Sequence, residues 1–166
     1  DPLLKVNYSN APEIDIKTED ISLSPNNVNL SIDSITLTFT VRNIGKSITS
    51  PVYVEVTRNF PGSPIDSVKS LFIHQLNYDT VIALKFPVQP AISGGINSFT
   101  VKVDIPNQFT EEFEEITNNQ ATADFFINID GMLPIWPYNY AVVSYDTVTV
   151  KASTINPIAP LKTYHF

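Results

Sequence analysis

Strict alternation of apolar and polar residues constrains the fold of this chain more than any other feature of its sequence. The clearest run is Ser34–Arg42, where apolar residues alternate with threonines. A period of two places successive side chains on opposite faces, so the run predicts a half-buried antiparallel strand. Similar alternation recurs in 51–58, 79–86, 97–105 and 121–129.

Turn-forming segments separate these runs, and the composition shows little helical pattern. Asn59–Pro64 and Pro87–Gly95 are both strong breakers, and the chain has 13 Pro and no Cys. The sequence therefore predicts an all-β fold: an immunoglobulin-like antiparallel β-sandwich of about seven strands over residues 13–129. Residues 1–12 are predicted to be a lead-in or linker. Residues 130–166 are predicted to be a linker and the start of a second, incomplete β-domain.

Two segments of the predicted sandwich are less regular. The apolar phase shifts within Glu13–Ser24, which favours a bulge or a switch between sheets. Ile65–Leu76 predicts one or two short strands with Val68, Leu71 and Ile73 facing inward. A short β segment such as 130–166 cannot bury a core alone. It should pack on the sandwich, pair with another copy, or remain mobile.

Net charge and residue content exclude several functional classes. A net charge of −7 argues against nucleic acid as a partner and against anionic membrane surfaces. No apolar run approaches the ~20 residues of a membrane-spanning helix, so we expect no membrane insertion. The absence of Cys excludes thiol catalysis and thiolate metal sites. The chain begins with Asp1-Pro2, and we expect a processed or excised piece of a longer protein.

The acidic stretch Asp104–Asn119 stands out between two predicted strands. Asp104, Glu112 and Glu114 are candidate Ca²⁺ ligands, because Ca²⁺ prefers six to eight oxygen ligands. In an extended hairpin, however, the four glutamates at 111, 112, 114 and 115 divide between two faces and do not converge. We favour a solvated hairpin whose charge keeps an edge soluble. The pair Asn118-Asn119 is interpreted as the turn that starts the last strand.

Aromatic residues supply the other candidate site. Trp136, Tyr138 and Tyr140, together with Tyr53, Phe60 and Tyr145, could form a platform for a carbohydrate or a protein partner. Alternatively, Trp136 lies in a hydrophobic seam between the sandwich and the next domain, which is the interpretation we favour. His74 and His165 have no zinc-site spacing, and nothing resembles a nucleophile elbow. No catalytic residue and no cofactor is therefore predicted, and the chain itself is not expected to be an enzyme.

Two motifs resemble a known family. The first is the strand end Val41-Arg42-Asn43-Ile44-Gly45. The second combines Val103-Asp104, the glutamates of 111–115 and Asn118-Asn119-Gln120-Ala121. In this order and at this separation they resemble the CARDB module, the cell-adhesion-related domain found in bacteria, over Glu13–Ile129. The chain is poor in glycine and has a long middle, Asn59–Leu76, for a member of that family.

The resemblance implies a non-catalytic spacer, adhesion or interaction module in a large bacterial protein that is secreted or exposed on the cell surface. Its partners would be neighbouring domains of the parent chain, and a protein or carbohydrate. Residues 130–164 resemble the segment that follows such modules in type IX secretion proteins, including relatives of gingipain-type cysteine peptidases. The alternative function is therefore an accessory domain of such a peptidase-associated protein, one that binds a glycan or a protein.

Overall fold

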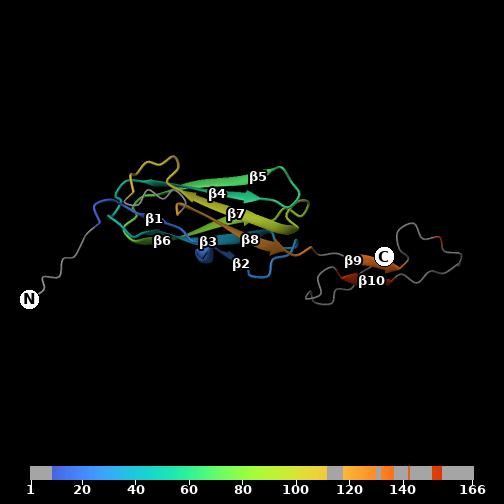
Figure 1. Ribbon diagram of the computed structural model, residues 1–166. Helices are drawn as coiled ribbons and strands as arrows, with labels where there is room; N and C mark the ends of the chain where they lie inside the picture. The colour runs from blue at the N-terminus through green and yellow to red at the C-terminus, as the bar shows by residue number, and fades with distance from the viewer. Residues whose placement is uncertain (1–8, 112–117, 130–131, 137–141, 143–150, 155–166) are drawn as a thin grey trace, which may run out of the picture.

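Two antiparallel four-stranded sheets stack face to face in the computed structural model, which describes residues 9–111, 118–129, 132–136, 142 and 151–154 (Figure 1). In the first sheet, β3 (Ser34–Asn43) pairs with β6 (Asp79–Pro87) on one side. On its other side it pairs with the short strands β1 (Ile14–Asp15) and β2 (Ser22–Ser24). The second sheet has the order β5 (Asp66–Ile73), β4 (Val52–Asn59), β7 (Gly95–Val103), β8 (Gln120–Ile127). These sheets confirm the predicted all-β sandwich.

The core lies between the two sheets, where the predicted alternation is observed. Every second residue of β3 and β4 is buried, with Phe39 of β3 and Val54 of β4 fully inaccessible. Phe86 from the first sheet meets Phe99 from the second edge to face, with ring centroids 5.2 Å apart. Such aromatic pairs add to the free energy gained by burying the rings themselves.

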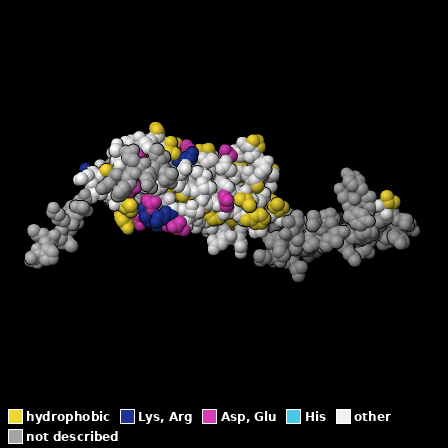
Figure 2. Space-filling view, viewed as in Figure 1, with side chains coloured by type: hydrophobic (Ala, Val, Ile, Leu, Met, Phe, Trp, Pro, Cys, Tyr) yellow, Lys and Arg dark blue, Asp and Glu magenta, His cyan; other side chains and the backbone are white. Residues whose placement is uncertain are grey.

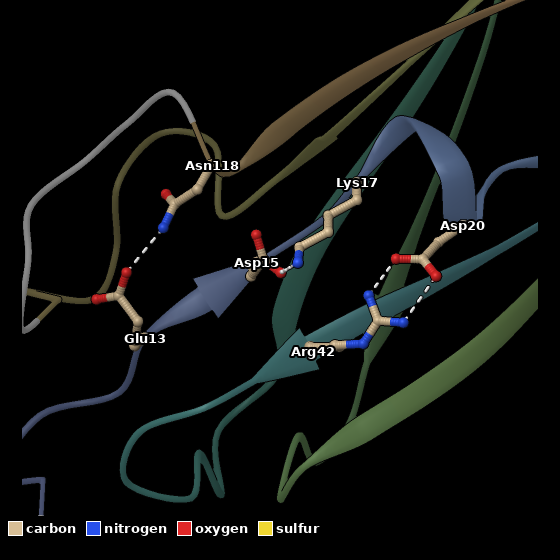
Figure 3. A network of polar contacts seen from close by, with 6 residues as sticks. All are labelled: Glu13, Asp15, Lys17, Asp20, Arg42 and Asn118. Atoms are coloured by element: carbon tan, nitrogen blue, oxygen red, sulfur yellow. Dashed lines mark hydrogen bonds and ion pairs between the residues drawn. The ribbon is translucent and has the colours of Figure 1, made fainter.

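The phase shift in Glu13–Ser24 has a different cause from the predicted bulge or sheet switch. A 3-10 turn, η1 (Thr18–Asp20), separates β1 from β2, and both strands pair with β3 in the same sheet. The guanidinium of Arg42 bonds both carboxylate oxygens of Asp20 beside this turn (Figure 3). This hydrogen bonding lowers the pKa of Asp20. The turn resets the alternation, so residues on both sides of it reach the core.

Strand β5 is a single edge strand, and one of its predicted inward residues faces outward. Ile73 is buried and Leu71 half-buried, but Val68 is 56% exposed. The register pairs Val68 with Thr57, a residue on the outer face of β4. The prediction for Val68 is wrong because β5 carries apolar residues on both faces.

Lys69 occupies an inward position on this edge strand. Its Nζ donates a hydrogen bond to the carbonyl of Lys85 in β6 and lies 5.2 Å from the centroid of the Phe86 ring. β5 and β6 border the same side of the sandwich in different sheets. A charged side chain that points inward from an edge strand is a recognised obstacle to further strand pairing.

The predicted strand 97–105 is shorter than its alternation indicates, and a further strand appears beyond residue 130. β7 ends at Val103, because Asp104 adopts a left-handed φ of 57° and turns Ile105 outward. Within 130–166, the segment predicted as a linker and the start of a second β-domain, β9 (Met132–Trp136) pairs with β10 (Lys151–Thr154). Among the described residues, no helix is long and apolar enough to cross a membrane.

Candidate functional site

The loop after β7 is organised by Asp104, one of the predicted calcium ligands. Its carboxylate is buried and accepts hydrogen bonds from the backbone N–H groups of Gln108, at 3.0 and 3.1 Å, and Phe109, at 3.1 Å. Its own N–H donates to the carbonyl of Tyr53 at 2.8 Å. Asp and Asn side chains commonly cap backbone groups in this way and tolerate a positive φ. The carboxylate therefore holds the loop in one conformation.

Glu112 and Glu114, the other two calcium candidates, lie outside the described residues. Within the part of the chain that the structure describes, no group of three acidic or histidine side chains is placed to hold a metal ion. The prediction that this stretch is a solvated hairpin without a metal site, with Asp104, Glu112 and Glu114 only as candidate ligands, is therefore not tested.

Glu111 is buried, although the sequence favoured a solvated acidic hairpin. Its carboxylate accepts a hydrogen bond from the backbone N–H of Ile14 at 2.8 Å and another from the Asn119 side chain. Burial raises the pKa of Glu111 above its ordinary value of 4.5, and the negative charges of Glu13 and Asp104 raise it further. The two hydrogen bonds act in the opposite direction. Glu111 thus ties the first strand to the turn before the last one.

Glu13 makes a second link between the same two segments (Figure 3). Its Oε1 accepts a hydrogen bond from Nδ2 of Asn118 at 2.7 Å, and its backbone N–H donates to Oδ1 of Asn43. Oδ1 of Asn43 also accepts from the N–H of Gly45, where an added Cβ would lie 2.4 Å from the carbonyl oxygen of Ala11. Only glycine permits this close approach of the two backbones.

We call this group, Glu13, Asn43, Glu111, Asn118 and Asn119, the N-terminal clasp. It lies where the described chain begins and joins segments about a hundred residues apart. Oδ1 of Asn118 and Oδ1 of Asn119 are buried and accept no hydrogen bond from the described residues. The turn role predicted for Asn118-Asn119 is confirmed, since β8 begins at the next residue. Their side chains also make long-range contacts that the sequence did not indicate.

An open groove of about 500 Å³ lies on the outer face of the second sheet. The register of β4 and β5 pairs Tyr53 with Phe72, and their rings meet edge to face with centroids 5.3 Å apart. The wall of the groove is formed by Ile105, Pro106 and Gln108, which belong to the loop that Asp104 holds. The groove has the volume of a ligand site, and no charged side chain lines it.

The aromatic residues singled out from the sequence do not form one platform. Tyr53 lines the groove, whereas Phe60 is buried beneath Arg58. Trp136 lies in β9, and Tyr138 and Tyr140 fall outside the described residues. Phe72, which the sequence analysis did not select, is the ring that Tyr53 meets.

Arg58 is a fully buried cation that the sequence analysis also missed. Its Nε donates to Oδ1 of Asn97 at 3.0 Å, and its terminal nitrogens donate to that oxygen, to Oγ of Ser93 and to the carbonyl of Pro87. Its Cζ lies 4.3 Å from the Phe60 ring centroid. Among the described residues it forms no ion pair, and burial lowers its pKa. Arg58 holds the β6–β7 loop against the end of the sandwich.

Comparison with known proteins adds one solved domain. No family model matches the chain, and no curated protein matches it. Among solved structures, the CARDB domain of a Pyrococcus furiosus protein, determined in complex with di-metal ions, is similar at 20% sequence identity and a TM-score of 0.48. The alignment covers 75% of this chain and 97% of that domain.

Proposed function

We propose that the sandwich is a non-catalytic spacer module of a larger protein that is secreted or exposed on the cell surface. The observation that carries this proposal is the path of the chain. It enters beside Gly45, where Lys46 donates to the carbonyl of Ala11, and leaves beside Val28, whose carbonyl accepts from Asn128 (Figure 1). These points lie at opposite ends of β3, whose ten residues span about 30 Å.

Both ends of the sandwich are held by buried polar groups. The N-terminal clasp joins β1 to the turn before β8, and Arg58 holds the loop beside the opposite end. A module with both ends held in this way keeps its neighbours at a constant separation. The clasp contains residues of both CARDB-like motifs, which supports assignment of the sandwich to that type of module.

The spacer proposal is tested by measuring the distance between the two ends. The chain has no Cys, so Lys46→Cys and Ser31→Cys, both at exposed positions, give two specific sites for spin labels. Pulsed electron resonance should show one narrow distribution at about 30 Å or more. A pair at one end, Lys46→Cys with Asn77→Cys, provides a short reference distance. A broad distribution for the first pair would mean that the sandwich does not hold its ends apart.

A second function is supported by the groove at Tyr53. We propose that it binds a neutral glycan, as an accessory domain of a gingipain-type peptidase or another secretion-associated protein would do. The paired rings of Tyr53 and Phe72 offer apolar faces to a sugar, and the Gln108 amide offers both donors and an acceptor. A charged ligand would find no counter-charge among the lining side chains.

The glycan proposal is tested with a panel of neutral oligosaccharides, measured by calorimetry. Tyr53→Ala should weaken any observed binding by about tenfold or more, since loss of a stacked ring costs on the order of 1 kcal/mol or more. Tyr78→Ala is the matched control, because Tyr78 is 64% exposed and does not line the groove. Equal loss of binding in both variants, or no binding by the unaltered protein, would reject the groove as a glycan site.

A further inference from the structure

The free edge of β6 presents backbone groups whose direction follows from the pairing of β6 with β3. Among the described strands, β6 pairs only with β3. At the two ends of this pairing, the N–H of Asn43 donates to the carbonyl of Tyr78, and the N–H of Val88 donates to that of Asp33. Bonded pairs in an antiparallel ladder recur at every second residue, so the even-numbered residues of β6 bond β3. The odd-numbered residues direct N–H and C=O to the free edge, namely Asp79, Val81, Ala83 and Lys85.

Lys69 of β5 covers one of these edge-facing groups. Its Nζ donates a hydrogen bond to the carbonyl of Lys85, which agrees with the direction assigned to that carbonyl. The side chains of the four edge-facing residues are all exposed, and that of Val81 is 66% exposed. An exposed strand edge with free backbone groups is a template for a strand from another chain. Lys69 therefore bonds a carbonyl that an added strand would need.

The charges on this edge are complementary to those of a second copy of the chain. If a twofold axis passes at Ile82, β6 pairs antiparallel with β6 of the second copy, and Asp79 lies opposite Lys85 of that copy. Val81 then lies opposite Ala83, and both members of each pair have backbone groups directed at the shared edge. Opposite charges directly across a strand pair stabilise it. Neither Asp79 nor Lys85 belongs to an ion pair of the described residues, so both are available for this contact.

Other registers of the same two strands lose these contacts. The direction of the backbone groups permits only shifts of two residues. A shift one way places Asp79 opposite Pro87, which has no N–H to donate. A shift the other way places Asp79 opposite Ala83 and Lys85 opposite Asn77. The register centred on Ile82 is therefore the one of these that has both charge pairs.

The surface around this edge carries charges of both signs. Figure 2 shows acidic, basic and hydrophobic side chains close together at the end of the sandwich where Figure 1 labels β1 and β6. The whole chain has a net charge of −7, which opposes association of two copies. The mixed surface means that a second copy would not meet a uniform field of like charge at this edge.

We propose that β6 is a pairing edge for a second copy of this chain and that Lys69 keeps this edge closed. In the register centred on Ile82, the first sheets of the two copies join into one continuous sheet. The hydrogen bond from Lys69 to the carbonyl of Lys85 has to break before the pairing is complete. The unaltered chain is therefore monomeric, and removal of the ammonium group opens the edge. This inference depends on neither the spacer function nor the glycan function.

Lys69→Met in the 166-residue chain tests the role of Lys69, because methionine keeps an unbranched side chain over Phe86 and removes the ammonium group. Sedimentation velocity at increasing protein concentration should show monomers for the unaltered chain and twofold dimers for the variant. Lys69→Thr should give the same result. Lys102→Met is the matched control, since it removes the same charge from β7, which is paired on both sides, and should remain monomeric.

The register is tested by further substitutions in the Lys69→Met variant. Lys85→Glu should weaken the dimer by about tenfold, because Asp79 then faces a like charge in both symmetry-related pairs. Addition of Asp79→Lys should restore the dimer with the charges exchanged. Val81→Pro removes an N–H that faces the free edge and not β3, so it should abolish the dimer while circular dichroism shows that the sandwich is retained.

Three outcomes would overturn the inference. Monomers of both Lys69→Met and Lys69→Thr at every concentration would mean that β6 does not pair with a second copy. A dimer of the unaltered chain would mean that Lys69 does not keep the edge closed. A dimer of Lys69→Met that persists with Val81→Pro, or that Asp79→Lys does not restore after Lys85→Glu, would place the contact elsewhere on the sandwich.

Discussion

Replacing Arg58 with alanine is expected to lower the free energy of unfolding by about 3–5 kcal/mol. The substitution removes a side chain with no exposed surface and leaves a cavity between Phe60 and Phe99. It also leaves Oδ1 of Asn97 and the carbonyl of Pro87 without the donor that they share in the native state. Chemical denaturation followed by circular dichroism measures the change.

Arg58→Met separates the two contributions to this loss. Methionine restores much of the volume and removes the cost of burying a charge, but it provides no hydrogen-bond donor. We therefore expect a smaller loss for Arg58→Met than for Arg58→Ala. Arg42→Ala serves as a control, because Arg42 is partly exposed and pairs with Asp20 near the surface, where ion pairs contribute about 1 kcal/mol or less. Equal losses for Arg58→Ala and Arg42→Ala would contradict the structural role of Arg58.

Glu111→Ala is expected to destabilise the sandwich by about 2–3 kcal/mol at neutral pH. The backbone N–H of Ile14 and Nδ2 of Asn119 would both lose their acceptor in a buried position. Glu111→Gln keeps one acceptor oxygen and removes the buried charge, so its loss at neutral pH should be about 1 kcal/mol or less. Similar losses for the two variants would show that the hydrogen bonds of Glu111 contribute little.

Because the pKa of Glu111 is raised, the difference in stability between the unaltered protein and Glu111→Gln should depend on pH. The folded state binds the proton at pH values above 4.5 at which the unfolded chain has released it. Stability contributed by this group is thus fully present below 4.5 and is lost as the pH rises through the raised pKa of the folded state. The stability of the unaltered protein relative to Glu111→Gln should therefore fall across that window. An increase would mean that the carboxyl has a lowered pKa.

Sequence alternation predicted the strands of the core because strand geometry alone decides which face each side chain takes. The same alternation also predicts which polar residues face the core. Arg58 is in phase with Val54 and Val56, and Asn97 is in phase with Phe99. A polar residue at an inward position predicts a buried polar partner, and Arg58 and Asn97 are such partners of each other. Val68 was wrongly placed because an edge strand needs only one well-covered face.

The clasp could not be derived from periodicity. Glu111 bonds a residue 97 positions earlier in the chain, and Glu13 bonds one 105 positions later. In the sequence Glu111 is one of several neighbouring glutamates that were expected to be solvated, whereas in the fold its side chain is buried. The family resemblance did point to Asn43, Gly45, Asn118 and the glutamates, and the structure supplies the physical reason for Asn43, Gly45, Asn118 and Glu111. The two motifs meet around Glu13 at one end of the sandwich.

Lys69 has a consequence for an array of such modules. Modules joined in one chain experience one another at high effective concentration, at which exposed strand edges exchange partners and neighbouring units misassemble. The ammonium group of Lys69 lies at the open side of the sandwich and donates a hydrogen bond to the carbonyl of Lys85. A neighbour that added a strand there would have to displace this bond and bury the charge. Lys69 would therefore favour separate folding of this sandwich in any chain where a like module follows it.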